Sequence, residues 1–283
     1  HRTHLRAVAY RMLGSLTEAD DAVQDTWLRL SRSGAGEVEN LGGWLTTIVA
    51  RVCLNMLRSR NLRREESFEA HLPDPVISRD GELQPEEEAL LADSVGLALL
   101  VVLDTLAPAE RLAFILHDMF ELPFEEIAPI VGRTPTAARQ LASRARRRVK
   151  GAAIPAPDPD LARQREVVDA FFLAARGGDF EALVALLDPA VVLRSDFGAA
   201  RPGAPKVFHG AAAVAGQALS GARLDGHLHP ALVNGAAGVI VTVRGRPFAI
   251  MGFIVAEGKI VEIDAIADPE RVRKFTAAIL NDE

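Results

Sequence analysis

The sequence is poor in cysteine and in long apolar runs, and each shortage narrows what the protein can be. Cys53 is the single cysteine among 283 residues, so it forms no internal disulfide, and its helical surroundings favour a small buried side chain over a reactive thiol. The longest run of only apolar residues and glycine, 95–103, has nine residues, whereas a membrane-spanning helix needs roughly 20. Residues 1–6 also lack the apolar stretch of a signal peptide. We therefore expect a cytoplasmic location and no membrane partner.

The overall composition predicts ordinary folded domains. Apolar residues make up 49% of the chain and charged residues 25%, so cores can form without metals or disulfides. A chain of 283 residues exceeds the usual size of one core, and a proline-rich break follows Lys150. At least two folding units are expected.

The net charge of -6 conceals a segregation of charge along the chain. Residues 67–93 contain eight acidic residues and one basic residue, whereas residues 133–150 contain seven basic residues and no acidic one. A helix-sized segment with only positive charge indicates a surface that faces phosphates. The acidic segment indicates a linker that precedes this basic unit.

The N-terminal half has the periodicity of helices. Apolar residues recur three and four positions apart in residues 5–64, which predicts two or three packed helices. Residues 94–150 are helical again, and breaks at Pro108, Pro123 and 132–135 divide them into four segments.

The C-terminal half mixes helices and strands. After the prolines of residues 151–160, a helix is predicted at 161–176 and a second after Gly178. Apolar residues then alternate, and the last segment is helical again. This pattern predicts an α+β unit with a curved antiparallel sheet. The predicted strands include 239–243, 248–255 and 260–266, and the last helix is 269–280.

A helix-turn-helix pattern surrounds the basic segment. Gly132 permits a tight turn, Thr134 is a good N-cap, and Pro135 suits the first helical position. In the helix that follows, apolar residues share one face and polar residues the other, so one face packs and the other can read base edges. The residues predicted to face DNA are Arg133, Thr136, Arg139, Gln140, Ser143, Arg144 and Arg147, with Arg146, Arg148 and Lys150 also placed to neutralise phosphates. A solvated basic helix without a DNA partner is the simpler alternative.

A second basic run follows the apolar segment 44–52, and it includes Arg51, Asn55, Arg58 and Arg60. It indicates a second contact with DNA, although arginines at a helix end also favour the helix dipole without any partner.

Three motifs in the first 51 residues carry a family resemblance. They are Ala9-Tyr10-Arg11-Met12-Leu13-Gly14, the acidic segment 18–25 that continues into Thr26-Trp27-Leu28, and Gly43-Trp44-Leu45-Thr46-Thr47-Ile48-Val49-Ala50-Arg51. With the helix-turn-helix they resemble the extracytoplasmic-function sigma factors, in which a σ2 and a σ4 domain are joined by a linker. The resemblance implies two all-α domains, a σ2 helical bundle at 1–66 and a σ4 helix-turn-helix at 94–150, with the acidic linker at 67–93.

This resemblance also implies partners and site residues. Asp21, Gln24, Asp25, Trp27 and Leu28 would dock on the clamp helices of the largest subunit of core RNA polymerase. Arg51, Asn55, Arg58 and Arg60 would bind the promoter -10 element, and the helix from Pro135 to Lys150 would bind the -35 element. A sigma factor directs initiation at promoter DNA without covalent chemistry of its own, so neither catalytic residues nor cofactors are expected.

The C-terminal half, 161–283, resembles the SnoaL-like domains, which have a cone-shaped α+β fold and extend a subgroup of sigma factors that includes sigma-J-like proteins. Three segments carry this likeness: His71-Leu72-Pro73-Asp74-Pro75, Glu257-Gly258-Lys259 and Asp268-Pro269-Glu270-Arg271-Val272. It implies regulation in cis through contacts between this domain, the linker and the sigma domains. The residues implied are Leu72, Pro73, Asp74, Pro75, Gly258, Lys259, Asp268 and Pro269.

A cone fold encloses a pocket, and five polar residues are predicted to line it or its mouth: Asp196, His209, His227, His229 and Asp264. A histidine and an aspartate could move a proton, but such histidines more often satisfy local hydrogen bonds, so no catalytic site is expected. His227 and His229 have no third ligand at a recognised spacing, so no metal site is expected either. A small ligand in this pocket is left open.

Two other functions compete with a sigma factor. One is a helix-turn-helix transcription regulator with a small-molecule-sensing SnoaL-like domain, which has no need of the docking residues between Asp21 and Leu28. The other is an isomerase or cyclase fused to a DNA-binding unit.

Overall fold

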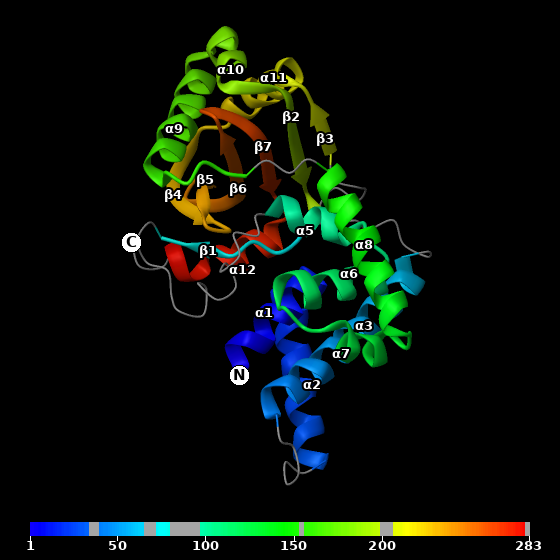
Figure 1. Cartoon of the computed structure of the whole chain (residues 1–283). Coiled ribbons are helices and arrows are strands. Elements are labelled where there is room, and N and C mark those ends of the chain that lie inside the picture. The colour runs from blue at the N-terminus through cyan, green and yellow to red at the C-terminus, as the bar shows by residue number, and fades with distance from the viewer. Residues whose placement is uncertain (34–39, 65–71, 80–96, 153–155, 199–205, 281–283) are drawn as a thin grey trace. The chain divides into compact units, whose positions relative to one another are not determined.

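The computed structural model describes residues 1–33, 40–64, 72–79, 97–152, 156–198 and 206–280 (Figure 1). The chain forms two compact units. The N-terminal unit comprises residues 1–67 and 85–154, and the C-terminal unit comprises residues 68–84 and 155–283. No helix in the described ranges is both long and apolar enough to cross a bilayer.

The N-terminal unit begins with three helices, α1 (Arg2–Leu13), α2 (Leu16–Ser33) and α3 (Leu41–Arg64), which pack against one another. The first helix ends at Gly14, whose φ of 69° lies in the left-handed region that glycine adopts without strain. Leu5, Val8 and Cys53 are fully buried in this part of the unit. Burial raises the pKa of the Cys53 thiol to about 12, so the residue is an inert core side chain, as predicted.

The second half of this unit, which contains the basic segment 133–150, has four helical segments, as the sequence predicted. They are α5 (Leu97–Asp104), α6 (Pro108–Phe114) with its π-helical continuation η1 (Ile115–Met119), α7 (Phe124–Val131) and α8 (Pro135–Gly151). The turn between α7 and α8 has Gly132 in the left-handed region, with φ of 69°. Thr134 caps α8, since its hydroxyl accepts a hydrogen bond from the Ala137 amide at 3.3 Å.

Arg111 connects the two halves of the N-terminal unit. Its side chain is 2% exposed, and its Nε and Nη2 atoms donate to the Arg11 carbonyl oxygen at 3.3 and 3.1 Å. Its Nη1 atom pairs with Asp104 at 3.0 Å. A buried guanidinium with these partners fixes α6 against the end of α1.

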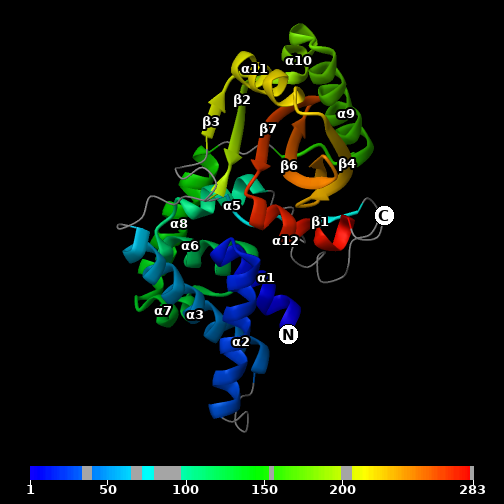
Figure 2. The ribbon, with the colours of Figure 1, turned by 180° about the vertical axis from the view of Figure 1, so that it is seen from behind.

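The C-terminal unit is a curved sheet with helices gathered at its two ends (Figure 1, Figure 2). The strand order is β1-β4-β5-β6-β7-β2-β3, and every neighbouring pair is antiparallel except β2 and β7, which are parallel. The strands are β1 (Ile77–Ser78), β2 (Leu187–Asp196), β3 (Lys206–His209), β4 (Gly226–Val233), β5 (Ala236–Val243), β6 (Arg246–Ala256) and β7 (Lys259–Ile266). The predicted α+β class is confirmed. The parallel pair of β2 and β7 is an exception to the predicted antiparallel sheet, because the alternation of apolar residues does not show strand direction.

Helices α9 (Leu161–Gly177), α10 (Phe180–Leu186) and α11 (Ala211–Ala222) lie toward one end of the sheet, and α12 (Pro269–Leu280) lies near β1 at the other (Figure 1, Figure 2). A core of buried apolar side chains joins α9, α10 and α11 to the sheet, with Phe171, Leu183 and Phe253 among its members. Phe171, Phe172 and Phe253 meet edge to face at centroid distances of 5.4 to 5.8 Å.

Part of the predicted acidic linker is a strand of this sheet. Ile77 and Ser78 of β1 pair with Val233 and Leu232 at the edge of β4. Backbone pairing of this kind covers an otherwise open sheet edge. His71, the first residue of the predicted linker motif, lies outside the described residues.

Candidate functional site

The polar face of α8 is exposed along its whole length. Three alanines with no exposed surface, Ala138, Ala142 and Ala145, hold the other face against the unit. Small side chains at this spacing let α8 lie close to its neighbours, and the residues of the opposite face are exposed. The exposed residues include all those predicted to face the -35 element: Arg133, Thr136, Arg139, Gln140, Ser143, Arg144 and Arg147.

The arginines of α8 differ in their partners. Arg144 pairs with Glu110 of α6 at 2.8 Å and Arg148 pairs with the same carboxylate at 3.5 Å, while Arg146 pairs with Asp118. Arg139 lies 5.2 Å from the centre of the Phe124 ring, a distance at which a cation is attracted to the ring face. The charges of Arg144, Arg146 and Arg148 are therefore partly neutralised within the unit, whereas Arg139 keeps the hydrogen-bonding edge of its guanidinium available.

The second basic segment lies on α3. Arg51, Asn55 and Arg58 are exposed and stand four and three positions apart, so they share one face of the helix. Arg60 is engaged inside the unit, since it donates to the Leu13 carbonyl oxygen at 3.0 Å and pairs with Glu18. The structure therefore gives Arg60 a structural contact, and its binding to the -10 element stays a prediction.

The predicted polymerase-docking residues form an exposed strip on α2. Asp21, Gln24 and Leu28 follow one another at helical spacing and are all exposed. Leu28 is 47% and Trp27 37% exposed, so two large apolar side chains that are adjacent in sequence face solvent. Asp25 pairs with Arg29 one turn later, at 2.9 Å.

The linker segment lies on the C-terminal unit through a network centred on Arg271 of α12. Arg271 donates to the carbonyl oxygens of Leu72 and Pro73 at 2.7 and 3.1 Å, and pairs with Asp74 at 3.0 Å and with Asp196 at 2.8 Å. Asp196 in turn accepts a hydrogen bond from the Leu72 amide at 2.8 Å. One guanidinium thus joins the linker to the end of β2.

A second contact fixes the linker at Val76. Its amide donates to Oδ1 of Asn234 at 2.9 Å, and its carbonyl oxygen accepts from the Asn234 amide at 2.8 Å. Leu72, Pro73 and Pro75 are buried in the same region. The predicted linker motif therefore has a defined binding surface within the C-terminal unit.

The other predicted regulatory residues have different surroundings. Asp268 caps α12, since its carboxylate accepts from the amides of Glu270 and Arg271, both at 2.9 Å. Gly258 lies in the turn between β6 and β7 with φ of 75°, and Lys259 donates to the Ala185 carbonyl oxygen. The side chain of Lys259 thus contacts α10 of its own unit.

A buried acidic pair lies on the same face of the sheet as the linker. Arg194 on β2 pairs with Glu262 at 2.6 Å and with Asp264 at 2.9 Å. Burial, and after it the neighbouring Glu262 carboxylate, raise the pKa of Asp264 to about 7, although Arg194 opposes the change.

The prediction that five polar residues line the pocket was wrong. The cavity of the C-terminal unit is lined by Gly226 and Leu228, so His227 and His229 point to the opposite face of β4. The same alternation removes Asp196 and Asp264, whose neighbours in sequence line the cavity. His209 is also absent from the lining. His229 instead bonds to Thr242 at 3.0 Å, which is the local hydrogen bond that the sequence analysis favoured.

Sequence reasoning missed several residues of the linker site. Asn234 carried no motif, and Asp196 was assigned to the pocket. Arg271 lay inside a quoted motif without an assigned role. Whether a charged residue at a strand end is buried can be seen only in the folded structure, so the sequence contained no signal for it.

The comparisons with known proteins extend over both units. Residues 1–63 match the model of sigma-70 region 2, and residues 96–149 match that of sigma-70 region 4. The chain is 36% identical over 294 residues to the ECF RNA polymerase sigma factor SigJ of Mycobacterium tuberculosis, covering 99% of this chain and 93% of the relative. It is 33% identical over 289 residues to the probable ECF sigma factor SigI of the same species, covering 99% and 94%. The crystal structure of the M. tuberculosis SigJ superimposes with a TM-score of 0.77 at 33% identity, over 95% of each chain.

Proposed function

Since this chain belongs to the extracytoplasmic-function family of RNA polymerase sigma factors, we propose that its α2 strip docks on the clamp helices of the polymerase largest subunit. Sigma factors bind core RNA polymerase and promoter DNA to start transcription. The exposed Asp21, Gln24, Trp27 and Leu28 support the docking surface, because an exposed patch with a carboxylate and two large apolar side chains suits a partner protein. The site of action proposed is the cytoplasm.

The exposed face of α8 supports binding of the -35 element, and it is the single observation that carries the proposal for DNA. Arg139 and Gln140 are exposed near the start of a helix that follows a tight turn, where recognition helices reach base edges. Arg147 and Arg133 would contact phosphates. The exposed Arg51, Asn55 and Arg58 of α3 are proposed to contact the -10 element.

The C-terminal unit is proposed to be a SnoaL-like regulatory domain that acts in cis and catalyses no reaction. Its cavity has no histidine, aspartate, glutamate, lysine, tyrosine or cysteine among the described lining residues, so it offers no side chain suited to moving a proton near neutral pH. Its contacts with residues 72–78 hold part of the chain that joins the -10 and -35 binding helices, α3 and α8. A tethered contact has a high effective concentration, so it can bias their arrangement.

Run-off transcription with purified core polymerase tests this function. The full chain is expected to start transcripts from a subset of a promoter library, and Leu28→Asp is expected to remove both core binding and transcripts. Failure of the wild-type chain to bind core polymerase, with operator-like DNA binding intact, would favour a helix-turn-helix regulator instead.

The same assay shows whether the C-terminal unit inhibits or activates transcription. Arg271→Ala removes the main contact of the linker, and Arg273→Ala, an exposed arginine of the same helix, is its matched control. Transcription that changes with Arg271→Ala alone would support regulation in cis, upward for an inhibitory contact and downward for an activating one. Equal transcription by both variants would contradict it.

A further inference from the structure

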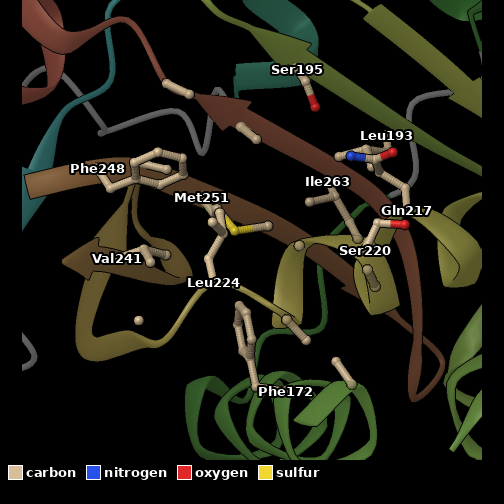
Figure 3. Close-up of a pocket in the computed structure, with 18 of the residues that line it drawn as sticks. Phe172, Leu193, Ser195, Gln217, Ser220, Leu224, Val241, Phe248, Met251 and Ile263 are labelled. Carbon is tan, nitrogen blue, oxygen red and sulfur yellow. The ribbon is translucent and has the colours of Figure 1, made fainter. Parts of the chain in front are cut away.

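The C-terminal unit contains a largely apolar cavity of about 380 Å³, within the range of roughly 300–1,000 Å³ typical of small-molecule sites. It lies between α9, α11 and the inward-facing residues of the sheet. Figure 3 shows Phe248, Met251 and Val241 toward one side of the view and the polar Ser195, Gln217 and Ser220 toward the other. The polar side chains are therefore grouped, and they lie on the same side of the view as the apolar Leu193 and Ile263.

The scarcity of charged side chains in the lining disfavours a bound ion. Arg176 is the only ionisable side chain among the described lining residues, and its Nη2 atom donates to the Gly226 carbonyl oxygen at 2.9 Å on the exposed rim. An ammonium inside would thus lose its hydration without gaining an ionic partner, and a carboxylate would meet a positive charge only at the exposed rim. The occupant suited to this cavity is neutral.

The aromatic content of the lining favours a ring. Phe172 and Phe197 line the cavity, and Phe248 lines it while remaining 41% exposed. Leu224, also in the lining, is 48% exposed. A bound ring would pack against the phenylalanines and cover apolar surface that otherwise faces water.

Two polar groups on the lining are available to such a ligand. Ser195 is 6% exposed, and no described residue forms a hydrogen bond with its hydroxyl or with the Gln217 amide. Both side chains carry donors, a hydroxyl on Ser195 and an amide on the partly buried Gln217, so a group in the cavity that accepts a hydrogen bond is favoured here. We propose that the cavity binds a neutral, ring-containing apolar molecule through one acceptor oxygen, and that its binding strengthens the contact of linker residues 72–78 with the opposite face.

The connection between the two faces is a shared strand end. Ser195 and Phe197 line the cavity, while Asp196 between them holds the Leu72 amide and Arg271 on the other face. Ala267 also lines the cavity, and its amide donates to the Asp196 carbonyl oxygen at 2.7 Å. A ligand that orders these residues therefore orders the acceptor of the linker. This second half of the proposal rests on the proposed regulation in cis.

Fluorescence of N-phenyl-1-naphthylamine, a neutral apolar probe, tests the cavity in the full chain. The probe is expected to bind and to be displaced by 2-acetylnaphthalene roughly threefold to tenfold more tightly than by naphthalene, the usual gain from one hydrogen bond. The anion 2-naphthoate should compete more weakly than naphthalene. The double change Ser195→Ala with Gln217→Leu should remove the preference for the ketone while retaining probe binding.

A filled cavity gives the second test. Ala218→Phe places a ring in the cavity from α11, and Ala213→Phe places one on the exposed side of the same helix as a control. Loss of probe binding in the first variant alone supports the site. Absence of probe binding by the wild-type chain, or equal binding by both variants, overturns it. Hydrogen exchange of the sheet in each variant shows whether the unit has stayed folded.

Reciprocal effects test the connection with the linker. Saturating 2-acetylnaphthalene should slow hydrogen exchange in peptides covering residues 72–79, and Arg271→Ala should weaken binding of that ketone by about fivefold or more, with Arg273→Ala unchanged. Unchanged exchange together with unchanged affinity overturns the connection. These binding measurements contain neither polymerase nor promoter, so their failure is distinct from a failure of the proposed sigma activity in run-off transcription.

Discussion

Replacing Arg271 by alanine should release the linker from the C-terminal unit while the sheet stays folded. Arg271 supplies two hydrogen bonds to linker carbonyl oxygens and ion pairs to Asp74 and Asp196. Removing one partner of a buried ion pair costs about 3–5 kcal/mol. Asp196 is 2% exposed but keeps the amides of Leu72 and Gly198 as donors, so we expect the lower end, about 3 kcal/mol.

Hydrogen exchange is the suitable assay, because both tryptophans and the single tyrosine lie in the N-terminal unit and their fluorescence does not report on the sheet. A loss of about 3 kcal/mol corresponds to roughly 100-fold faster exchange of the peptide containing residues 72–79. The control Arg273→Ala loses only a bond to its own helix, at the Pro269 carbonyl oxygen, so it should change stability by less than about 0.5 kcal/mol.

Two results would refute this reasoning. One is wild-type exchange of residues 72–79 in Arg271→Ala, which would mean that the pairing of β1 with β4 holds the linker without the guanidinium. The other is equally accelerated exchange in β5 and β6, which would show that Arg271 stabilises the whole unit and not the linker contact. Asp74→Asn, which removes one of the ion pairs, should give a smaller acceleration than Arg271→Ala.

Three further outcomes follow from the same structure. Arg139→Ala should weaken binding of the preferred -35 sequence by about 1–3 kcal/mol, as measured by anisotropy titrations. Arg148→Ala should instead weaken binding to all sequences and lower the salt dependence of binding. Equal losses on every sequence for Arg139→Ala would contradict its assignment. Leu28→Ala should weaken core polymerase binding by about 1–2 kcal/mol through lost apolar burial, and unchanged affinity would remove it from the docking surface. Since burial raises the pKa of Asp264 to about 7 from its ordinary 3.8, folding takes up a proton between these values, and stability falls as pH rises through this window. Asp264→Asn should flatten that slope in pH-dependent unfolding of the sheet, and an unchanged slope would assign it to another group.

The sequence by itself determined most of the N-terminal unit. Local signals suffice there, because Gly132, Thr134 and Pro135 act on their own backbone, and the periodicity of α8 separates a packing face from a polar face within one helix. The exposure of Arg139 and Gln140 therefore agrees with the prediction. The partners of Arg60 and Arg144 did not follow from the sequence, because Glu18 and Glu110 lie 42 and 34 residues away along the chain.

Only the tertiary structure decided which polar residues of the C-terminal unit face the cavity. The histidines at 227 and 229 were correctly expected to share a face, but alternation alone leaves open which of the two faces is enclosed. Helices α9 and α11 enclose the face that carries Leu228 and Ser195, and this assigns Asp196 to the opposite face, beside Arg271 and the linker. Long-range pairing of residues 72–78 with strands far along the chain is a property of packing, and no local pattern contains it.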